Sequence, residues 1–286
     1  MNAEKLYAQL EKDFVRPGMV ENWYDYSSLT DIAEYVCDNF KERSIGLLCD
    51  FTDEINKVYT AVFPSDKVLT KILGDGTTNA MLFVHHPCDW DLGKEPGKAF
   101  YPMNAELLQK LKDRRVSLFN FHYPLDNFGE YSTGKTLADA LGLQIEKPFG
   151  MFDGAVCAVI CTTDCKDIHE LNARYSRVVG HETKLYQYGS DEIVNGKIGI
   201  CAGGGNDTGV IRELIENNIN VLISGLSVNN SYSAEAHELE RENGINLIGG
   251  THYSSEKFAC IAMCKYFEKL GLMSEFIHDS PCFEDL

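Results

Sequence analysis

Short apolar runs alternate with amphipathic segments along most of the chain, and this alternation limits the possible folds more than any other feature. The apolar runs have the length of strands, whereas the segments between them have the 3.6-residue spacing of helices. Strands separated by helices pair in parallel, because a parallel connection needs a long crossover. The pattern therefore predicts an α/β fold with mixed, mainly parallel sheets. Clear examples are NAMLFVHHP (79–87), NAELLQKLKDRR (104–115), VSLFNFHYPLDN (116–127) and KTLADALGL (135–143).

Two further segments give local predictions. SLTDIAEYVCDNFKER (28–43) has an amphipathic pattern and is predicted to be helical. CAGGGNDTG (201–209) reads as a glycine turn between a strand and a helix. Such a turn can offer backbone N–H groups to a phosphate, or it can let backbone pack tightly beside a functional site. We favour packing for Gly203-Gly204-Gly205, because the segment matches neither G-x-G-x-x-G nor a P-loop.

Composition excludes several classes of protein. The formal net charge is −17 and no Lys/Arg-rich block offsets it, which argues against a nucleic-acid partner. No apolar stretch reaches the roughly 18 residues of a membrane span, and the first residues lack the core of a signal peptide. Most of the ten cysteines lie in apolar runs and none forms a C-x-x-C pair. We therefore expect reduced core thiols in a cytoplasmic protein of 286 residues, long enough for two domains.

Histidines and carboxylates gather at three predicted strand ends. Only eight histidines occur in the chain, and His85 and His86 are adjacent. The second cluster joins His122 to Asp126, and the third joins His252 to Glu256. The carboxyl ends of strands in an α/β sheet are where ligand sites form. Residues four apart share one face of a helix, so we expect His252 and Glu256 to point the same way at the start of the last helix. In the second cluster, Pro124 favours a turn over a helix.

This donor set suits Zn²⁺, Mn²⁺, Fe²⁺ or Ni²⁺ and contains too much nitrogen for Ca²⁺. Five ligands exceed what one tetrahedral zinc ion needs, whereas two ions bridged by a carboxylate would use them all. Asp126 is the natural bridge, with His85 and His86 reaching opposite ions. Against this stands the ordinary role of histidine as a hydrogen-bonded core or surface residue. That role is expected for the four histidines without a matching partner, which are His169, His181, His237 and His278.

The segments VHHP (84–87), FHYPLDN…TLADALGL, GICAGGGND…VLISG and GGTHYSSEK (249–257) resemble, in order and separation, those of one protein family. This is the GTP cyclohydrolase 1 type 2 homologue family, also called NGG-one-interacting-factor-three-like. The resemblance implies two α/β domains around a dinuclear metal centre, without the large insertion of longer members, and assembly into a hexameric ring. We expect the first domain to comprise residues 1–130 and 246–286, and the second 131–245.

The resemblance also implies roles for individual residues. The metal ligands would be His85, His86, Asp126, His252 and Glu256, holding two divalent ions. His122 would act beside the ions, either by supporting a ligand through a hydrogen bond or by transferring protons. Three positions depart from the family pattern, namely Tyr123, Pro124 and Leu226.

The expected function is that of a metal-dependent hydrolase acting on a small-molecule substrate. A phosphate-containing nucleotide or a small phosphoester is the predicted class, since GTP itself enters only through the family label. The alternative is a metal-binding, metal-delivery or regulatory protein without catalysis. Few lysines lie near the ligand motifs (Lys94, Lys135 and Lys257), so the hydrolase is only modestly favoured.

Overall fold

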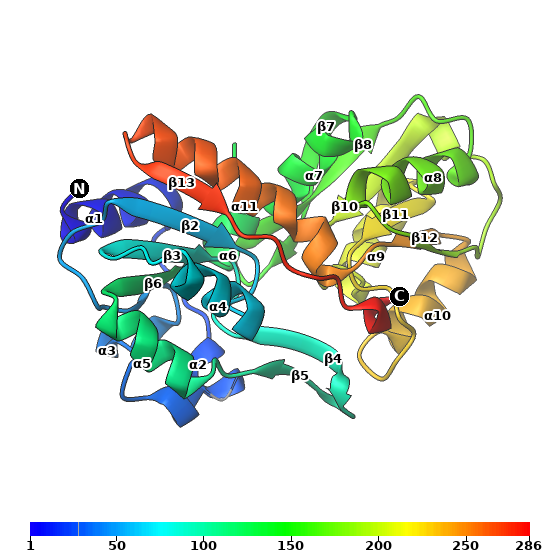
Figure 1. The fold of residues 1–286 in the computed structure, drawn as a ribbon. Coiled ribbons are helices and arrows are strands. Elements are labelled where there is room, and N and C mark those ends of the chain that lie inside the picture. Colours follow the sequence, from blue (N-terminus) through cyan, green and yellow to red (C-terminus); the bar gives the residue numbers. More distant parts are fainter. Residues whose placement is uncertain (28) are drawn as a thin grey trace. The chain divides into compact units, whose positions relative to one another are not determined.

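A computed structural model describes residues 1–27 and 29–286, and its contacts divide the chain into two compact units (Figure 1). Unit 1 comprises Met1–Leu125 and Cys260–Ser280, and unit 2 comprises Asp126–Ala259 and Pro281–Leu286. The predicted second domain ends at residue 245, whereas unit 2 continues through Ala259. The difference arises because the strand that begins at Asn246 is hydrogen-bonded into the sheet of unit 2.

Unit 1 is built on a five-stranded sheet in the order β1-β6-β3-β2-β13. The β6–β3, β3–β2 and β2–β13 pairings are parallel, and only β1 runs antiparallel to its neighbour β6. A separate hairpin, β4–β5, lies in the same unit. The strands are β1 (Gly46–Cys49), β2 (Lys57–Ala61), β3 (Ala80–Val84), β4 (Asp89–Glu95), β5 (Lys98–Tyr101), β6 (Val116–Asn120) and β13 (Met273–Phe276).

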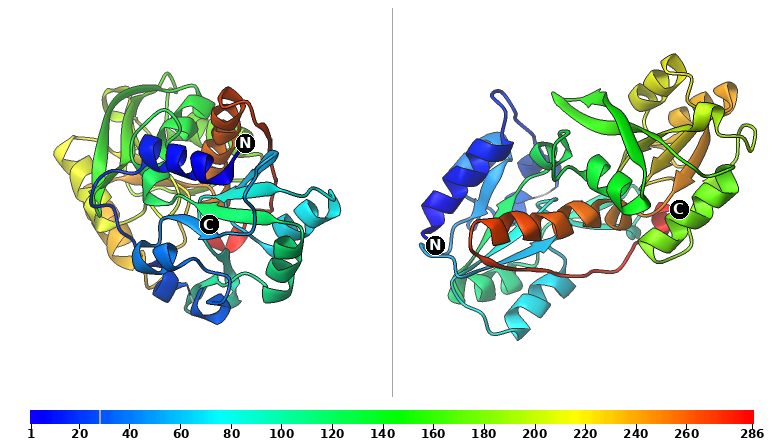
Figure 2. Two further views of the ribbon diagram at one scale, coloured as in Figure 1. Left: turned by 90° about the vertical axis from the view of Figure 1, so that its left-hand side faces the viewer. Right: turned by 90° about the horizontal axis from the view of Figure 1, so that it is seen from above.

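Helices cover both faces of this sheet, as Figures 1 and 2 show. On one face, α4 (Asp66–Gly74) and α5 (Ala105–Asp113) bury their apolar sides against alternate residues of β2, β3 and β6. On the other face lie α1 (Ala3–Phe14) and the second half of α11 (His252–Lys269). The rings of Tyr7 and Phe119 stack at 5.6 Å, and those of Phe83 and Phe267 meet at 5.7 Å. The central strands are therefore buried on both sides.

Unit 2 has a six-stranded mixed sheet in the order β7-β8-β10-β11-β12-β9. The β10–β11 and β11–β12 pairings are parallel, and the flanking pairings are antiparallel. The predicted α/β fold with mixed sheets is thus confirmed, with the parallel pairings at the centre of the unit 2 sheet and from β6 to β13 in unit 1. The strands are β7 (Gln144–Phe152), β8 (Ala155–Thr162), β9 (Lys184–Tyr186), β10 (Lys197–Cys201), β11 (Val221–Ser224) and β12 (Asn246–Gly249).

The helices of unit 2 form two layers, one on each face of its sheet. One core joins the sheet to α7 (Thr133–Leu141) and α8 (Ile168–Val179), and a second core joins it to α9 (Thr208–Glu216) and α10 (Ala234–Asn243). Local signals set the helix limits. Asp207 caps α9 by accepting from the Gly209 and Val210 amides, and Gly142 ends α7 in the left-handed region at φ 71°.

Two local predictions were wrong. The segment 28–43 is not one helix: a 3₁₀ turn, η1 (Leu29–Ile32), precedes α3 (Asp38–Arg43), and Ser28 lies outside the described residues. The Cys37 amide donates to the Leu48 carbonyl, which holds the intervening chain to β1 and interrupts the helix. The turn expected at Pro124 is instead a single helical turn, α6 (Tyr123–Asp126). Proline is tolerated there because the first turn of a helix needs no N–H donor.

The remaining short elements are α2 (Trp23–Tyr26), η2 (Val194–Gly196) and η3 (Phe283–Asp285). Within residues 1–27 and 29–286, no helix is both long and apolar enough to cross a membrane.

Candidate metal site

Three histidines of unit 1 meet at the carboxyl edge of its parallel strands. His85 and His86 directly follow β3, and His122 follows β6, whose Asn120 is in register with Val84. The ring centroids are 4.5 Å apart for His85 and His86, 4.8 Å for His86 and His122, and 5.1 Å for His85 and His122. One nitrogen from each ring lies within 4.8 Å of the other two. The fold therefore brings together histidines from two separate strand ends.

The backbone after β3 is held in place by its neighbours. The His85 amide donates to the Ala61 carbonyl at 3.2 Å, and the His86 amide donates to the Val62 carbonyl at 2.9 Å. The Asn120 side chain donates to the His85 carbonyl at 2.6 Å. Both histidines are almost completely buried, with relative exposures of 0% and 1%. Their positions are thus set by the sheet itself rather than by a loop.

Hydrogen bonds also set the tautomers of two of these rings. His85 Nδ1 lies 3.0 Å from the Phe121 carbonyl oxygen, and His122 Nδ1 lies 2.6 Å from Glu21 Oε2. A carbonyl or an ionised carboxylate can only accept, so Nδ1 carries the proton in both rings. The lone pair is then on Nε2, the form in which a neutral imidazole binds a metal ion.

Glu21 is a functional candidate that the sequence did not reveal. Its side chain is 2% exposed and lies against a histidine 101 positions away in the sequence. It also accepts from Trp23 Nε1 at 2.6 Å and from the Tyr123 amide at 3.0 Å. Nothing in the local sequence marks this carboxylate, because two of its partners, His122 and Tyr123, lie about a hundred positions further along the chain.

Aromatic side chains pack around the histidines. The Trp23 ring meets His122 edge-on at 4.8 Å and His86 at 5.6 Å. The Phe63 ring stacks on His86 at 4.6 Å. These contacts restrict the rotation of the imidazole rings and make their surroundings apolar. An apolar environment strengthens the interaction between an ion and its ligands.

His252 and Glu256 lie one turn apart on the same face at the start of α11 in unit 2, as their four-residue spacing predicts. His252 Nε2 lies 3.2 Å from Glu256 Oε1, and the two residues are 4% and 3% exposed. The pair offers one nitrogen and one carboxylate group from a single helix face.

The glycine turn packs directly on this pair. Gly203 adopts φ +65°, and a Cβ atom added there would lie 2.0 Å from Glu256 Oε1 and 3.2 Å from His252 Nε2. The Gly203 amide donates to Ser255 Oγ at 2.9 Å, and the Gly203 carbonyl accepts from the Leu226 amide at 2.8 Å. These contacts support the packing role predicted for the turn, since this backbone N–H is used by Ser255.

The start of α11 is fixed from two directions. Thr251 Oγ1 accepts from the Ser254 amide at 3.1 Å, and Asp285 Oδ2 accepts from the His252 amide at 2.8 Å. Asp285 is fully buried, and its carbonyl accepts from the amides of Ser227 and Val228, each at 2.8 Å. No local sequence pattern indicates this contact, because Asp285 lies 33 positions from its partner.

Asp126, the predicted bridging ligand, is the last residue of α6 and belongs to unit 2. Its Oδ1 accepts from Thr133 Oγ1 at 2.7 Å, so the first residue of α7 orients the carboxylate.

The remaining histidines have ordinary contacts, with one difference from expectation. His181 bonds Ser254, His169 lies 3.6 Å from Asp191, and His278 packs on Phe276. His237 was expected to have no matching partner, yet it is buried 3.4 Å from the carboxylate of Glu240 on the same helix. The i,i+3 spacing of these two residues was the available signal.

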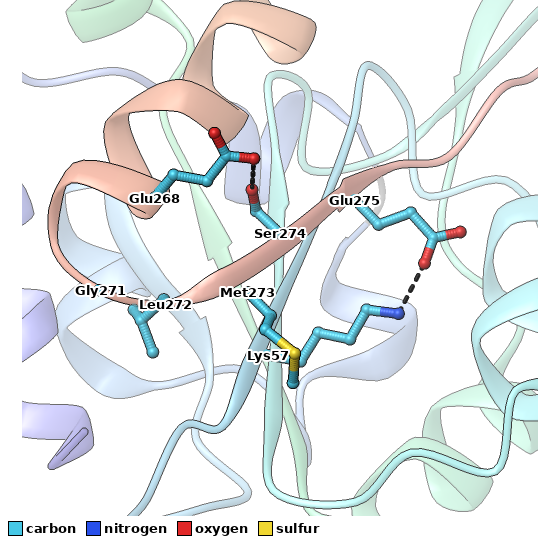
Figure 3. Close-up of a pocket in the computed structure, with 7 residues that line it drawn as sticks. All are labelled: Lys57, Glu268, Gly271, Leu272, Met273, Ser274 and Glu275. Carbon is cyan, nitrogen blue, oxygen red and sulfur yellow. Dashed lines mark hydrogen bonds and ion pairs between the residues drawn. The ribbon is translucent and has the colours of Figure 1, made fainter.

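An open groove in unit 1 is a weaker candidate site (Figure 3). Figure 3 shows the Lys57–Glu275 ion pair (2.6 Å) and the Glu268–Ser274 hydrogen bond (3.5 Å) beside it. Lys57 pairs with Met273 and Ala80 at the amino ends of their parallel strands. The histidines lie at the opposite, carboxyl ends, where α/β sheets place their ligands. The groove is therefore separate from the histidine cluster of unit 1.

The donor chemistry of both units fits a transition-metal ion. Unit 1 offers imidazole nitrogens, and unit 2 offers imidazole nitrogen and carboxylate oxygen. These buried histidine and glutamate groups could hold an ion of the Zn²⁺, Fe²⁺, Mn²⁺ or Ni²⁺ type.

Comparison with known proteins gives consistent matches. The sequence model of Duf34/NIF3 (NGG1p interacting factor 3) matches residues 28–280. A Borreliella burgdorferi protein named GTP cyclohydrolase 1 type 2 homolog is 25% identical over 247 residues, covering 86% of this chain and 91% of the relative. A Pseudomonas aeruginosa protein of the same name is 25% identical over 269 residues, covering 92% and 96%.

Solved structures share the fold. The protein ybgI, described as of unknown function, superimposes with a TM-score of 0.73 at 18% identity, covering 99% of this chain and 100% of that one. Reduced HcgD from Methanocaldococcus jannaschii gives a TM-score of 0.67 at 20% identity, with 98% of each chain covered. At these identities the likeness establishes the fold alone.

Proposed function

Because this chain belongs to the Duf34/NIF3 family, as the sequence resemblance predicted, we propose that it is a dinuclear-metal-dependent hydrolase. The proposed substrate class is a nucleotide or small phosphoester. The main support is the meeting of three histidines at the carboxyl edge of the unit 1 sheet, two of them in the tautomer that binds metal through Nε2.

We propose that the ligands are divided between two ions. His85 and His86 would each bind one ion, Asp126 would bridge them, and His252 with Glu256 would complete the coordination. The assignment of residues from both units to one pair of ions rests on the order of the family motifs in the sequence. His122 would then act beside the ions, by supporting a ligand or transferring protons.

When bound, such ions lower the pKa of a coordinated water and polarise a C–N or phosphoester bond. The chain's own contribution is orientation. Asn120 and the β2 backbone fix the two adjacent histidines, Thr133 orients Asp126, and the glycine turn fixes Glu256. Trp23 and Phe63 keep the histidine rings in apolar surroundings.

One observation favours the alternative of a metal-binding or metal-delivery protein. The three lysines near the ligand motifs all have other contacts. Lys257 donates to the Val179 carbonyl, and burial lowers the pKa of its ammonium group. Lys135 forms an ion pair with Asp139, and the Lys94 ammonium lies over the Tyr101 ring. A phosphate substrate would need another cation, so the metal ions themselves would have to bind it.

An activity screen separates the two functions. Metal-loaded wild-type protein would be assayed against nucleoside triphosphates and small phosphoesters, with His86→Ala and His252→Ala as paired variants. The hydrolase predicts turnover that disappears on chelation and falls in both variants. Absence of turnover, together with rapid transfer of the ions to an acceptor chelator, would instead support metal delivery.

The proposed assembly is a homohexameric ring, on the resemblance alone, and the proposed location is the cytoplasm, on the expectation of reduced core thiols. Size-exclusion chromatography with light scattering should then give about six times the 32.1 kDa chain mass, and a stable monomer would contradict this proposal.

A further inference from the structure

Two cysteines of unit 2 bring their sulfur atoms together at the ends of neighbouring strands. Cys157 lies near the start of β8, Cys201 is the last residue of β10, and their Sγ atoms are 3.9 Å apart. Both are free thiols, but they differ in accessibility, since Cys201 is 3% exposed and Cys157 is only partly buried. An oxidant that arrives from solvent therefore meets Cys157 first.

Hydrogen bonds point the buried thiol at the exposed one. Cys157 donates its single thiol proton to the Gly150 carbonyl at 3.1 Å, so Cys201 is the donor in the contact between the two sulfurs. This contact, together with burial, raises the pKa of the Cys201 thiol. Cys201 therefore keeps its proton and is the second of the two thiols to react.

The backbone allows the two sulfurs to join. Cys201 is in register with Ala158 on the antiparallel strand β8, so Cys157 is offset from it by one residue. Spacings of about 4.5–5.5 Å across a strand pair and about 3.4 Å along a strand give a Cα separation of roughly 6 Å, and disulfides span about 4.4–6.8 Å. Neighbours in a regular strand point to opposite faces, but both thiols here pack against the core beneath α9 and α10. The sulfurs would have to close from 3.9 Å to about 2.05 Å.

Cys201 is coupled to Glu256 through the glycine turn. A Cβ atom added at Gly205 would lie 2.5 Å from the Cβ atom, the carbonyl oxygen and the Sγ atom of Cys201, so the turn packs closely on this residue. Two residues earlier the same turn packs on Glu256, where a Cβ atom at Gly203 would overlap Oε1. Movement of Cys201 toward its partner therefore shifts the backbone that fixes this carboxylate.

Cys157 is coupled to Asp126 through the start of β8. The Val156 amide donates to Asn127 Oδ1 at 3.1 Å, and the Phe128 amide donates to the Val156 carbonyl at 2.8 Å. These bonds tie the residue before Cys157 to the two residues that follow Asp126. The pair of thiols thus connects the two segments of unit 2 that carry the Asp126 and Glu256 carboxylates.

We infer that Cys157 and Cys201 form a reversible disulfide on oxidation, and that this disulfide weakens metal binding by the carboxylates of unit 2. One oxygen of Asp126 and one of Glu256 lie within 4.8 Å of each other, and the disulfide pulls on the backbone beside both. The effect on metal binding rests on the proposed function, whereas formation of the disulfide does not. Under reducing conditions the site keeps its full affinity, and a peroxide lowers it.

A peroxide is the class of oxidant that balances this reaction. The Cys157 sulfur attacks one oxygen of hydrogen peroxide, the O–O bond breaks, and a sulfenic acid and one water form. The Cys201 sulfur then attacks the sulfenic sulfur. The S–S bond forms, the S–O bond breaks, and the Cys201 proton leaves with the hydroxide as a second water. Two thiols thus give two electrons to one peroxide, and a dithiol reverses the step by becoming a disulfide itself.

Mass spectrometry of the full-length protein after treatment with hydrogen peroxide tests the disulfide. Once free thiols are alkylated and the chain is digested with trypsin, the peptide that contains Cys201 should be linked to Cys157. Cys201 is the only cysteine of its tryptic peptide, and dithiothreitol should release it. A link from Cys201 to Cys161 or Cys165 instead, or sulfinic acid at Cys157 with Cys201 still free, would overturn the inference.

Zinc titration tests the consequence for the metal site. Protein that has been oxidised and then freed of peroxide should bind Zn²⁺ roughly tenfold more weakly than reduced protein, and dithiothreitol should restore the affinity. Cys157→Ala and Cys201→Ala, treated in the same way, should keep the affinity that they have when reduced. Cys264→Ser is the matched control, because Cys264 is also partly buried but contacts the Thr60 hydroxyl, at 3.2 Å, and should respond like wild type.

The outcomes separate this inference from the proposed function. If the disulfide forms but oxidised and reduced protein bind Zn²⁺ equally, the pair does not act on the metal site and only this inference fails. If reduced wild type binds no Zn²⁺, the proposed function fails, and the cross-linked peptide still decides whether the two thiols form a disulfide.

Discussion

Glu240 and His237, buried side by side on α10, illustrate how single residues set the pH dependence of this protein. Burial raises the pKa of Glu240 to about 8, opposed in part by Arg241, and burial lowers the pKa of His237. Among the described residues, the Glu240 carboxyl oxygens accept no hydrogen bond, while His237 contacts the Tyr188 hydroxyl at 2.9 Å. Near neutral pH both partners are therefore uncharged, and their 3.4 Å approach is not an ion pair.

This arrangement predicts that stability falls as the pH rises. An unfolded glutamate ionises near pH 4.5, whereas the folded one keeps its proton until about pH 8. Between these values the native state binds more protons, so the free energy of unfolding decreases with pH. We expect the wild type to lose roughly 3 kcal/mol between pH 5 and pH 8, and Glu240→Gln to lose much less. Urea unfolding at three pH values measures this, and parallel curves would contradict it.

Gly203 gives a second prediction at the scale of the residue. In Gly203→Ala, the new methyl group would meet Glu256 Oε1, and alanine would be strained at φ +65°. We expect a loss of about 1–2 kcal/mol in stability and weaker metal binding, because the carboxylate must move. Gly204→Ala is the matched control, since a Cβ atom there meets nothing within 4 Å. Equal effects of the two substitutions on metal affinity would show that the turn does not position Glu256.

At the scale of the element, the amino end of α11 depends on Asp285. Removing its carboxylate in Asp285→Ala leaves the buried His252 amide without this acceptor, which typically costs about 1–3 kcal/mol. Hydrogen exchange should become faster in the first turns of α11, where His252 and Glu256 lie. Glu284→Ala, one exposed position away, should leave that exchange unchanged. Unaltered protection in Asp285→Ala would mean that Thr251 alone fixes the helix start.

Elements with strong local signals were predictable from the sequence, and elements set by distant contacts were not. α7 covers most of the segment KTLADALGL and ends at Gly142, and α11 begins with the expected His252–Glu256 pair. The segment 28–43 fails as a single helix because the Cys37 amide bonds to β1, a contact that no local pattern encodes. The β4–β5 hairpin was missed because its strands are short of apolar residues and only partly buried, so no sustained apolar alternation marks them.

At the scale of the whole molecule, the residues of the candidate site that follow from local patterns were predictable, and those set by distant contacts were not. The sequence placed the histidines at strand ends, and parallel neighbours in register bring His85, His86 and His122 together. Glu21 and Asp285 escaped prediction because each acts through a partner far away in the chain, and their neighbours in the sequence show no periodic pattern. The candidate ligands are therefore easier to identify from the sequence than the residues that orient them.

The most direct test of the dinuclear site is metal analysis of protein purified without chelator or affinity-column metal, compared with Asp126→Ala. The proposed function predicts close to two ions per chain in the wild type and the loss of at least one ion in the variant, because Asp126 is the proposed bridge. Wild-type protein that is metal-free and also fails to take up Zn²⁺, Mn²⁺ or Fe²⁺ would contradict both the hydrolase and the metal-delivery proposals.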